Sequence, residues 1–390
     1  MKQLKRPLAW LLAGLIITAA LLWYGVHRST NIALQKAEAV QFRRMTLAQL
    51  DKANNYRFFY ASNRRLAEQG DHNENRHSKQ LAYGHFETTI EPSVGLGMFI
   101  NPTSWFQNEE IALGDITPLS QVAFSEQLGQ LIAQSPQHSL LIIVHGYKEA
   151  FASALRKTAF LSHVLDINTP VLLFDWPGNQ GTSLRGYRRA RQVATDSGVE
   201  LATLLDTVVN DIKPQRLWLV ANSMGAQVVV NAFEALYENR SWADSETELE
   251  HVVLTAPDVS IDEFDSHFKP RLMALARNLT VYVSSNDRAL VMSRIVNRST
   301  RLGESPVNPS QLEEAAKLVE LLEPGQERIT LVDVTPVNRT RNFHNFSLET
   351  PEFFDDLYLR LLNDRAPQTR LRYRLLTPEG NVYWVLTRGR

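Results

Sequence analysis

The sequence of 390 residues contains no cysteine, which excludes disulfides and a lipid-modified N-terminal cysteine. It also lacks an excess of charge of either sign, because 41 Lys and Arg residues nearly balance 42 Asp and Glu residues. A chain without a global basic field is a poor partner for nucleic acid, and we therefore expect none. Internal repeats and low-complexity tracts are absent as well. The length and composition fit one large domain with extensions.

One long apolar run stands near the N-terminus. Residues 8–26 contain no charged side chain, and a membrane-spanning helix needs about 20 apolar residues. Three cationic residues precede the run and Arg28 follows it, so the positive-inside rule places the N-terminus in the cytoplasm. The alternative is a cleaved signal peptide, but its best cleavage site, Ala37–Ala39, lies too far beyond the run. We favour an uncleaved single-pass anchor in the inner (cytoplasmic) membrane, with the rest of the chain in the periplasm or otherwise outside the cytoplasm.

Further along the chain, strand-like runs alternate with helical patterns. This alternation predicts an α/β protein with a mostly parallel sheet, right-handed crossovers and helices on both faces. Functional groups then gather at the carboxyl ends of the strands. A polar loop at 66–84 and an edge strand at Phe86–Ile90 are expected before this core, and a β-hairpin within 371–386 after it. The strand-like runs lie near 140–144, 170–175, 217–221, 251–256, 279–285 and 329–334, and the helical patterns near 149–166, 186–211, 224–239, 310–322 and 351–363.

The most informative segment is Leu217–Gly225, where an apolar run ends at Ala221-Asn222-Ser223-Met224-Gly225 and a helical pattern follows at once. A strand, a sharp turn with a central serine and a helix together form a nucleophile elbow. Ala221 and Gly225 are small, as the close approach of strand and helix requires. The turn places the Ser223 hydroxyl at the positive end of the helix dipole, where an oxyanion would form. Ser223 is therefore the candidate nucleophile, and the alternative is a buried serine at a strand end.

The partners of a nucleophilic serine follow in the order serine, acid, histidine that this geometry requires. His344 follows the last strand-like run, and a loop there lies beside the elbow, so we expect it to be the general base. Asp258 and Asp287 follow the first and the second strand after the elbow strand. We favour Asp287 as the acid that orients the histidine. Asp258 is the alternative acid, and it could instead cap the segment after Pro257.

An oxyanion hole requires two preorganised backbone N–H groups. We expect one from Met224, directly after the nucleophile. The other is expected from Tyr147, because the strand-like run 140–144 ends at His145-Gly146 and Gly146 permits a tight turn. His145 then braces the loop rather than transferring protons. No acid or histidine stands near it at metal-ligand spacing, and neither a metal ion nor another cofactor is implied.

Six blocks of residues, taken in their order along the chain, resemble a bacterial group of esterase/lipase-like alpha/beta-hydrolase proteins of largely unknown function. The resemblance covers about residues 56–362. It implies an alpha/beta-hydrolase core and a triad of Ser223, Asp287 and His344. The blocks are Tyr60-Ala61-Ser62-Asn63-Arg64, Val144-His145-Gly146-Tyr147, Asp175-Trp176-Pro177, Ala221-Asn222-Ser223-Met224-Gly225, Ala256-Pro257-Asp258-Val259 and Ser285-Asn286-Asp287-Arg288-Ala289-Leu290.

The expected organisation is a cytoplasmic tip and transmembrane anchor at 1–29, a polar extension at 30–85, a catalytic domain at 86–365 and a hairpin extension at 366–390. The expected activity is that of a membrane-anchored serine hydrolase, which cleaves a small-molecule or lipid carboxylic ester through an acyl-enzyme. Acyl transfer or amide hydrolysis would use the same groups. The competing hypothesis is a non-catalytic envelope protein that uses the hydrolase fold to bind another protein.

A cluster of arginines follows the Gly-rich loop 178–181. Arg185, Arg188, Arg189 and Arg191 lie within one predicted helix. Such a cluster can form an anion-binding or headgroup-binding lip beside an active site. It is also typical of a solvated helix face, and we favour that interpretation.

Overall fold

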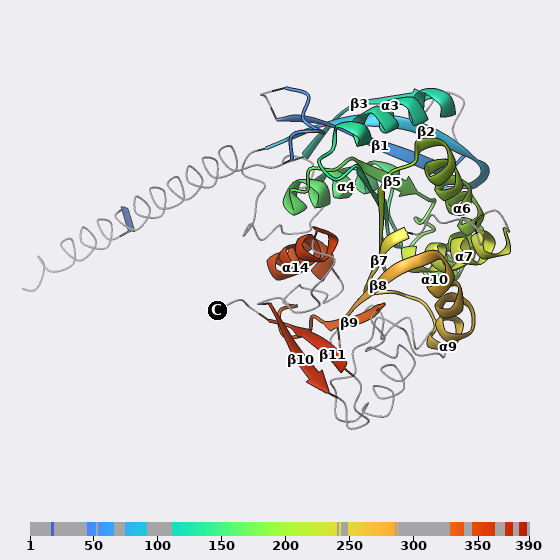
Figure 1. Cartoon of the computed structure of the whole chain (residues 1–390). Coiled ribbons are helices and arrows are strands. Elements are labelled where there is room, and N and C mark those ends of the chain that lie inside the picture. Colours follow the sequence, from blue (N-terminus) through green and yellow to red (C-terminus); the bar gives the residue numbers. More distant parts are fainter. Residues whose placement is uncertain are drawn as a thin grey trace, which may run out of the picture.

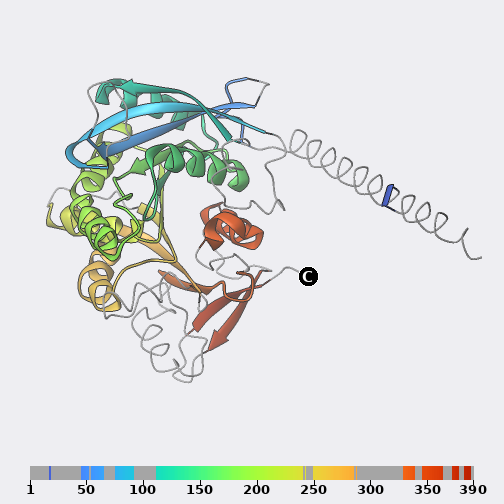
Figure 2. The ribbon, with the colours of Figure 1, turned by 180° about the vertical axis from the view of Figure 1, so that it is seen from behind.

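The computed structural model is shown in Figures 1 and 2. It describes residues 17–18, 45–51, 54–65, 75–91, 111–239, 242, 249–284, 287, 328–338, 345–362, 371–376 and 382–387.

The described strands form one 11-stranded sheet in the order β10-β11-β9-β8-β7-β6-β4-β5-β1-β2-β3. Every pairing from β11 to β1 is parallel, whereas the pairings at the two ends are antiparallel. The predicted mostly parallel sheet is therefore confirmed. The strands are β1 (Asn55–Arg64), β2 (His77–Ile90), β3 (Ile111–Leu119), β4 (Ser139–Val144), β5 (Val171–Asp175), β6 (Arg216–Asn222), β7 (Leu249–Thr255), β8 (Ala276–Val283), β9 (Ile329–Asp333), β10 (Arg372–Leu376) and β11 (Val382–Leu386).

Helices cover both faces of the sheet (Figures 1 and 2). Side chains of α3, α5, α6, α7 and α10 pack into the hydrophobic core on one face. Side chains of α4, α13 and α14 pack into the core on the other face. The helices are α3 (Gln121–Gln134), α4 (Phe151–Leu165), α5 (Leu184–Asp196), α6 (Gly198–Thr207), α7 (Gly225–Glu238), α9 (Ile261–Glu263), α10 (Lys269–Leu275), α13 (Phe346–Glu349) and α14 (Pro351–Leu362).

Strand β4 illustrates why the sequence forms a doubly covered sheet. Leu140, Ile142 and Val144 join one core, and Leu141 and Ile143 join the other. Successive side chains of a strand point to opposite faces, so an uninterrupted apolar run is buried on both. Burial of each such side chain contributes roughly 1.5–3 kcal/mol. The central strands are therefore a rigid support for the residues at their carboxyl ends.

The N-terminal part of the sheet differs from the prediction. Phe86–Ile90 does not form an edge strand, because it lies in β2, which pairs with β1 on one side and β3 on the other. The predicted loop 66–84 ends earlier, since β2 already begins at His77. Strand β1 and the first residues of β2 come from the segment that we assigned to the extension 30–85, and they belong to the same sheet as the rest. The division into domains stays a prediction.

The predicted hairpin is present at the C-terminus as the antiparallel pair β10–β11, which continues the sheet through β9. A buried ion pair fastens it to the core. Arg372 Nη2 lies 2.5 Å from Asp356 Oδ2 of α14, and the Tyr282 hydroxyl of β8 donates to the same carboxylate at 2.7 Å. The hairpin is thus attached through charge as well as through the β-ladder.

The predicted membrane anchor, residues 8–26, lies outside the described residues except for 17–18. Among the helices that the structure does describe, none has the length and hydropathy needed to span a bilayer.

Candidate active site

Ser223 occupies the turn between strand β6 and helix α7. Its φ of +53° lies in the left-handed region, which is rare for a residue with a side chain. Three backbone hydrogen bonds hold this conformation. The Ser223 N–H donates to Thr255 O at 2.9 Å, and the Ser223 carbonyl accepts from the N–H groups of Ala226 and Asp258, each at 3.1 Å. The turn therefore has the backbone of a nucleophile elbow.

The small residues at the elbow have a steric cause. A Cβ added to Gly225 would lie 2.6 Å from His145 O and 2.8 Å from Val144 O, so only glycine fits there. Ala221 is fully buried, and it pairs with Val144 on one side and Leu254 on the other. The close approach of β4, β6 and α7 thus requires the small residues that the sequence places there.

The loop after β4 passes directly over Ser223. A Cβ added to Gly146 would lie 3.1 Å from Ser223 Cβ and 3.1 Å from Asn222 O. The next residue, Tyr147, donates its hydroxyl to Gly181 O. Within the described ranges, neither the Tyr147 N–H nor the Met224 N–H meets a hydrogen-bond acceptor. Both N–H groups remain available for a ligand beside the serine.

The two candidate acids lie in different surroundings. Asp258, after β7, contacts Ser223 through its backbone, and its Oδ2 accepts a hydrogen bond from the Tyr187 hydroxyl at 2.6 Å. Asp287, after β8, is 1% exposed, and its N–H lies 3.4 Å from Ser284 O. Both acids are at the carboxyl edge of the sheet, with Asp287 one strand further from Ser223. Their roles stay predictions.

His344 lies outside the described residues, but the described residues on either side of it in the sequence lie at this edge. Before it, Asn338 Nδ2 donates to Ser284 Oγ at 2.9 Å, close to Asp287. After it, Ser347 Oγ lies 3.4 Å from Asn222 Oδ1, the residue that precedes Ser223. The chain that carries His344 therefore leaves and returns at positions next to the candidate acid and the candidate nucleophile.

A buried charged cluster, which the sequence did not predict, lies beneath the Gly146–Tyr147 loop. Asp175, at the end of β5, is fully buried and lies 2.7 Å from Arg64 Nε of β1. It also accepts from the Ser62 hydroxyl at 2.6 Å. Burial by itself would raise the pKa of Asp175, but Arg64 and His145 lower it to about 2. The Asp175 carboxylate is therefore charged at any physiological pH.

His145 connects this cluster to the loop. Its Nε2 lies 3.0 Å from Asp175 Oδ1, and its Nδ1 lies 2.9 Å from Gly146 O. The Trp176 indole stacks on the imidazole at 5.5 Å between ring centroids, and the indole N–H donates to His145 O at 2.8 Å. These contacts fix the loop from below, as expected of a bracing residue. We name Ser62, Arg64, His145 and Asp175 the loop cluster.

Comparison with known families supplies the classification. Residues 120–365 match the model of a family described as "Alpha/beta hydrolase of unknown function (DUF900)". The match spans more than half of the chain. The chain belongs to this family. Its fold is therefore the alpha/beta-hydrolase fold that the six sequence blocks indicated.

The comparison with curated proteins found no match for this chain. The solved structures that are similar to it at a low level include two esterases. One is a zinc-bound, cold-adapted esterase from an Arctic intertidal metagenomic library, with 10% identity and a TM-score of 0.36 over 80% of this chain and 96% of that chain. The other is the thermophilic esterase Est2 of the Planctomycetes species Thermogutta terrifontis with propionate bound. It has 10% identity and a TM-score of 0.32 over 59% of this chain and 86% of that chain. At this level of similarity, neither structure gives information on the activity of this protein.

A signal for the loop cluster is present in the sequence. Arg64 and Asp175 each end a strand of otherwise mostly apolar residues. Because a buried charge needs a partner of opposite sign, each residue indicates that such a partner exists. The two residues belong to two of the six blocks. In the described part of the chain, no group of three or more His, Asp or Glu side chains is arranged to hold a metal ion.

Proposed function

We propose that this protein is a membrane-anchored serine hydrolase that cleaves carboxylic esters. The Ser223 hydroxyl attacks the acyl carbon and gives its proton to His344. The alcohol then leaves with that proton, and an acyl-enzyme forms on Ser223 Oγ. Water repeats the sequence and releases the carboxylic acid. Asp287 orients His344, and the N–H groups of Tyr147 and Met224 stabilise the oxyanion.

The observation that carries this proposal is the backbone of Ser223. A left-handed serine at a strand–helix turn costs conformational energy, of order 1–3 kcal/mol, and three hydrogen bonds maintain it. Ser223 is 6% exposed, so the strained residue lies at a buried turn. Gly146 lies against Ser223, so a loop with backbone N–H groups passes next to the serine. Together they support an activated serine with an oxyanion hole.

Asp287 is the better acid of the two candidates. The Oδ2 of Asp258 is already engaged by the Tyr187 hydroxyl, which points that carboxylate toward α5. Asn338, the last described residue before His344, contacts Ser284 in the segment after β8, where Asp287 lies. We therefore expect Asp287→Asn to lower kcat by on the order of 10⁴-fold, and Asp258→Asn to lower it much less. The reverse order of the two variants would assign the role to Asp258.

Hydrolysis of short-chain and long-chain esters by the full-length chain in detergent tests the activity, with Ser223→Ala as the matched control. Loss of turnover in Ser223→Ala with unchanged thermal unfolding supports the proposal. Turnover that survives the substitution contradicts it. Capture of a protein partner that persists in Ser223→Ala, without turnover in the parent, would favour the non-catalytic envelope protein. Products formed only with an alcohol or amine acceptor would identify acyl transfer.

The anchor at residues 8–26 and the extracytoplasmic location belong to the same proposal. Because the chain contains no cysteine, single cysteines can report on topology without further changes. We expect Arg185→Cys, on an exposed helix position, to react with a membrane-impermeant maleimide in intact cells. Lys2→Cys should react only after the membrane is permeabilised. The opposite pattern would reverse the orientation.

A further inference from the structure

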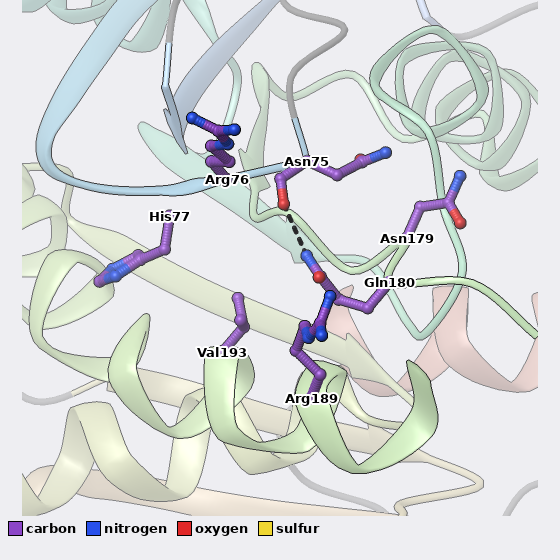
Figure 3. Close-up of a pocket in the computed structure, with 7 residues that line it drawn as sticks. All are labelled: Asn75, Arg76, His77, Asn179, Gln180, Arg189 and Val193. Atoms are coloured by element: carbon purple, nitrogen blue, oxygen red, sulfur yellow. Dashed lines mark hydrogen bonds between the residues drawn. The ribbon is translucent and has the colours of Figure 1, made fainter. Parts of the chain in front are cut away.

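A polar pocket lies between the start of strand β2, the loop after β5 and helix α5. Its volume is about 550 Å³, within the range of about 300–1,000 Å³ that small-molecule sites occupy. Figure 3 shows α5 on one side of the pocket and the residues before β2 opposite it. The lining residues are Asn75, Arg76, His77, Asn179, Gln180, Arg189 and Val193.

Two cations of this pocket have no acidic partner among the described residues. Arg76 and Arg189 are exposed, and within the described part of the chain neither guanidinium forms an ion pair or a side-chain hydrogen bond. Their neighbours differ. Arg191 Nη2 lies 3.0 Å from Glu263 Oε2, and His77 Nε2 lies 2.8 Å from Glu200 Oε2. The net positive charge of the pocket therefore comes from the two arginines.

His77 adds a donor with little net charge. The hydrogen bond to Glu200 raises the pKa of His77 above its ordinary value, against the opposing effect of burial. When His77 is protonated, its charge and that of the Glu200 carboxylate offset each other. The arrangement leaves the two guanidiniums, each with several N–H donors in a planar fork, as the groups that an anion would meet.

The pocket is built in advance of any ligand. Gln180 Nε2 donates to Asn75 O at 2.7 Å (Figure 3). It also donates to Pro177 O at 2.9 Å. These bonds join the loop after β5 to the residues before β2. On the other side, a Cβ added to Gly186 would lie 2.5 Å from Gln180 O, so the first turn of α5 packs tightly on the same loop.

Arg189 differs from the other exposed arginines of α5 in the face of the helix on which it lies. Arg189 and Val193 are four residues apart and therefore lie on one face of α5, and both line the pocket. Arg185 and Arg188 are exposed on the same helix but do not line it. The arginine cluster is thus in part a solvated helix face, as we favoured from the sequence, and in part a wall of this pocket.

The pocket shares its walls with the candidate active site. The loop that carries Asn179 and Gln180 also contacts the Gly146–Tyr147 loop. The Lys148 N–H donates to Gly178 O at 3.0 Å, and the Tyr147 hydroxyl donates to Gly181 O. Helix α5 also contacts the Gly146–Tyr147 loop, because the Tyr187 ring packs against the Tyr147 ring at 5.6 Å between ring centroids.

We propose that this pocket binds a phosphate group carried by the ester substrate. Two guanidiniums with no ion-pair partner among the described residues match the charge of a phosphate monoester, which is close to −2 at neutral pH. Arg forks bind phosphate oxygens bidentately. The ester would then lie across the loop after β5, with its phosphate in the pocket and its acyl carbon at Ser223. The phosphate site stands on the pocket itself, whereas its place in the substrate rests on the proposed hydrolase function.

The site is tested by titrating inorganic phosphate into full-length Ser223→Ala protein in detergent, with calorimetric detection. We expect saturable binding that Arg76→Gln and Arg189→Gln each weaken by about tenfold or more. Arg188→Gln is the matched control, with the same change of charge on the same helix, and should weaken binding less than about twofold. Absence of saturable binding, or equal losses for Arg188→Gln and Arg189→Gln, would overturn the site.

The substrate role is tested with two esters that differ only in a phosphate group. The parent chain should show a higher kcat/KM for the phosphorylated ester. Arg189→Gln should remove this preference, and Arg188→Gln should keep it. Equal kcat/KM values would overturn the substrate role. If neither ester is hydrolysed, the hydrolase proposal fails, and the phosphate titration still decides the pocket.

A comparison of membranes distinguishes the two sources of such a phosphate. Binding to phosphatidylcholine vesicles that contain phosphatidic acid, lost in Arg189→Gln and kept in Arg188→Gln, would identify a lipid headgroup. Binding of inorganic phosphate with the same dependence on the variants, but no preference between vesicle types, would identify a soluble phosphate ester.

Discussion

Two buried Arg–Asp pairs of similar geometry have different positions in this molecule. The pair Arg64–Asp175 has exposed side-chain fractions of 1% and 0%, and the pair Arg372–Asp356 has the same values. The first belongs to the loop cluster and touches the Gly146–Tyr147 loop through His145. The second pair fastens β10 to α14 and β8. We name Tyr282, Asp356 and Arg372 the hairpin cluster.

The comparison separates stability from catalysis. Both pairs are buried to the same extent, so loss of either carboxylate leaves an unpaired guanidinium in the interior. Only the loop cluster supports a backbone segment that contacts Ser223. The same local chemistry is therefore expected to matter for stability at both places and for activity at one.

The largest effect is expected from Asp175→Asn. It removes the charge that holds Arg64 and His145, and we expect a loss of about 3–5 kcal/mol in the free energy of unfolding. The loop over Ser223 would shift as well, which lowers kcat/KM by on the order of 100-fold. Denaturant unfolding and ester hydrolysis by the folded fraction measure the two losses. Unchanged kcat/KM would mean that the loop cluster does not position the Gly146–Tyr147 loop.

Asp356→Asn is the matched change in the hairpin cluster. We expect a similar loss of about 3–5 kcal/mol in the free energy of unfolding, with kcat/KM of the folded protein within about twofold of the parent. The two assays are the same as for Asp175→Asn. A parallel fall in kcat/KM would remove the distinction between the clusters.

The two regions should also lose stability in different pH windows. His251 of β7, near Arg360 and Arg372, has its pKa lowered to about 3, first by burial and then by Arg360. The folded state keeps this imidazole neutral while the unfolded chain takes up a proton, so stability falls as the pH decreases from 6.5 to about 3. Asp175, with its pKa lowered from 3.8 to about 2, adds a loss only below pH 3.8.

Denaturant unfolding at a series of pH values checks these windows. His251→Gln should flatten the dependence of the unfolding free energy between pH 6 and 4, in about the range where a free histidine gains its proton. Asp175→Asn should leave that range unchanged and flatten the curve at lower pH. The same flattening by both variants would contradict the assignment.

The smallest effects are expected from removal of one neutral donor in each cluster. Ser62→Ala deletes the hydroxyl that donates to Asp175 at 2.6 Å, and Tyr282→Phe deletes the hydroxyl that donates to Asp356 at 2.7 Å. Each should cost about 1–2 kcal/mol of unfolding free energy. Thermal unfolding measures this cost. Only Ser62→Ala should lower kcat/KM, and a loss in Tyr282→Phe instead would invert the comparison.

The sequence predicts the parts of the fold that depend on local pattern. Runs rich in apolar residues locate β4, β5, β6, β7, β8 and β9, because these strands are buried on both faces. The elbow is predictable because the steric demand at Ala221 and Gly225 is local. Strand β3 was missed, since its mixed and largely exposed residues show no run of this kind.

Contacts between distant residues could not be predicted in the same way. Arg64 and Asp175 are 111 positions apart, and each residue by itself indicates only that a partner exists. The difference between Arg188 and Arg189 likewise depends on where Asn75–His77 fold back onto α5. Such pairings follow from the tertiary arrangement, and no local pattern of the sequence contains them.

The most direct test of the account is the site of a covalent adduct. Full-length chain in detergent is treated with a fluorophosphonate probe, and the labelled peptide is identified by mass spectrometry. An activated serine in an oxyanion hole predicts a single adduct on Ser223, absent from the Ser223→Ala variant and present in folded Asp356→Asn. No adduct on well-folded parent protein, or an adduct on another serine, would contradict the assignment of Ser223 as the nucleophile.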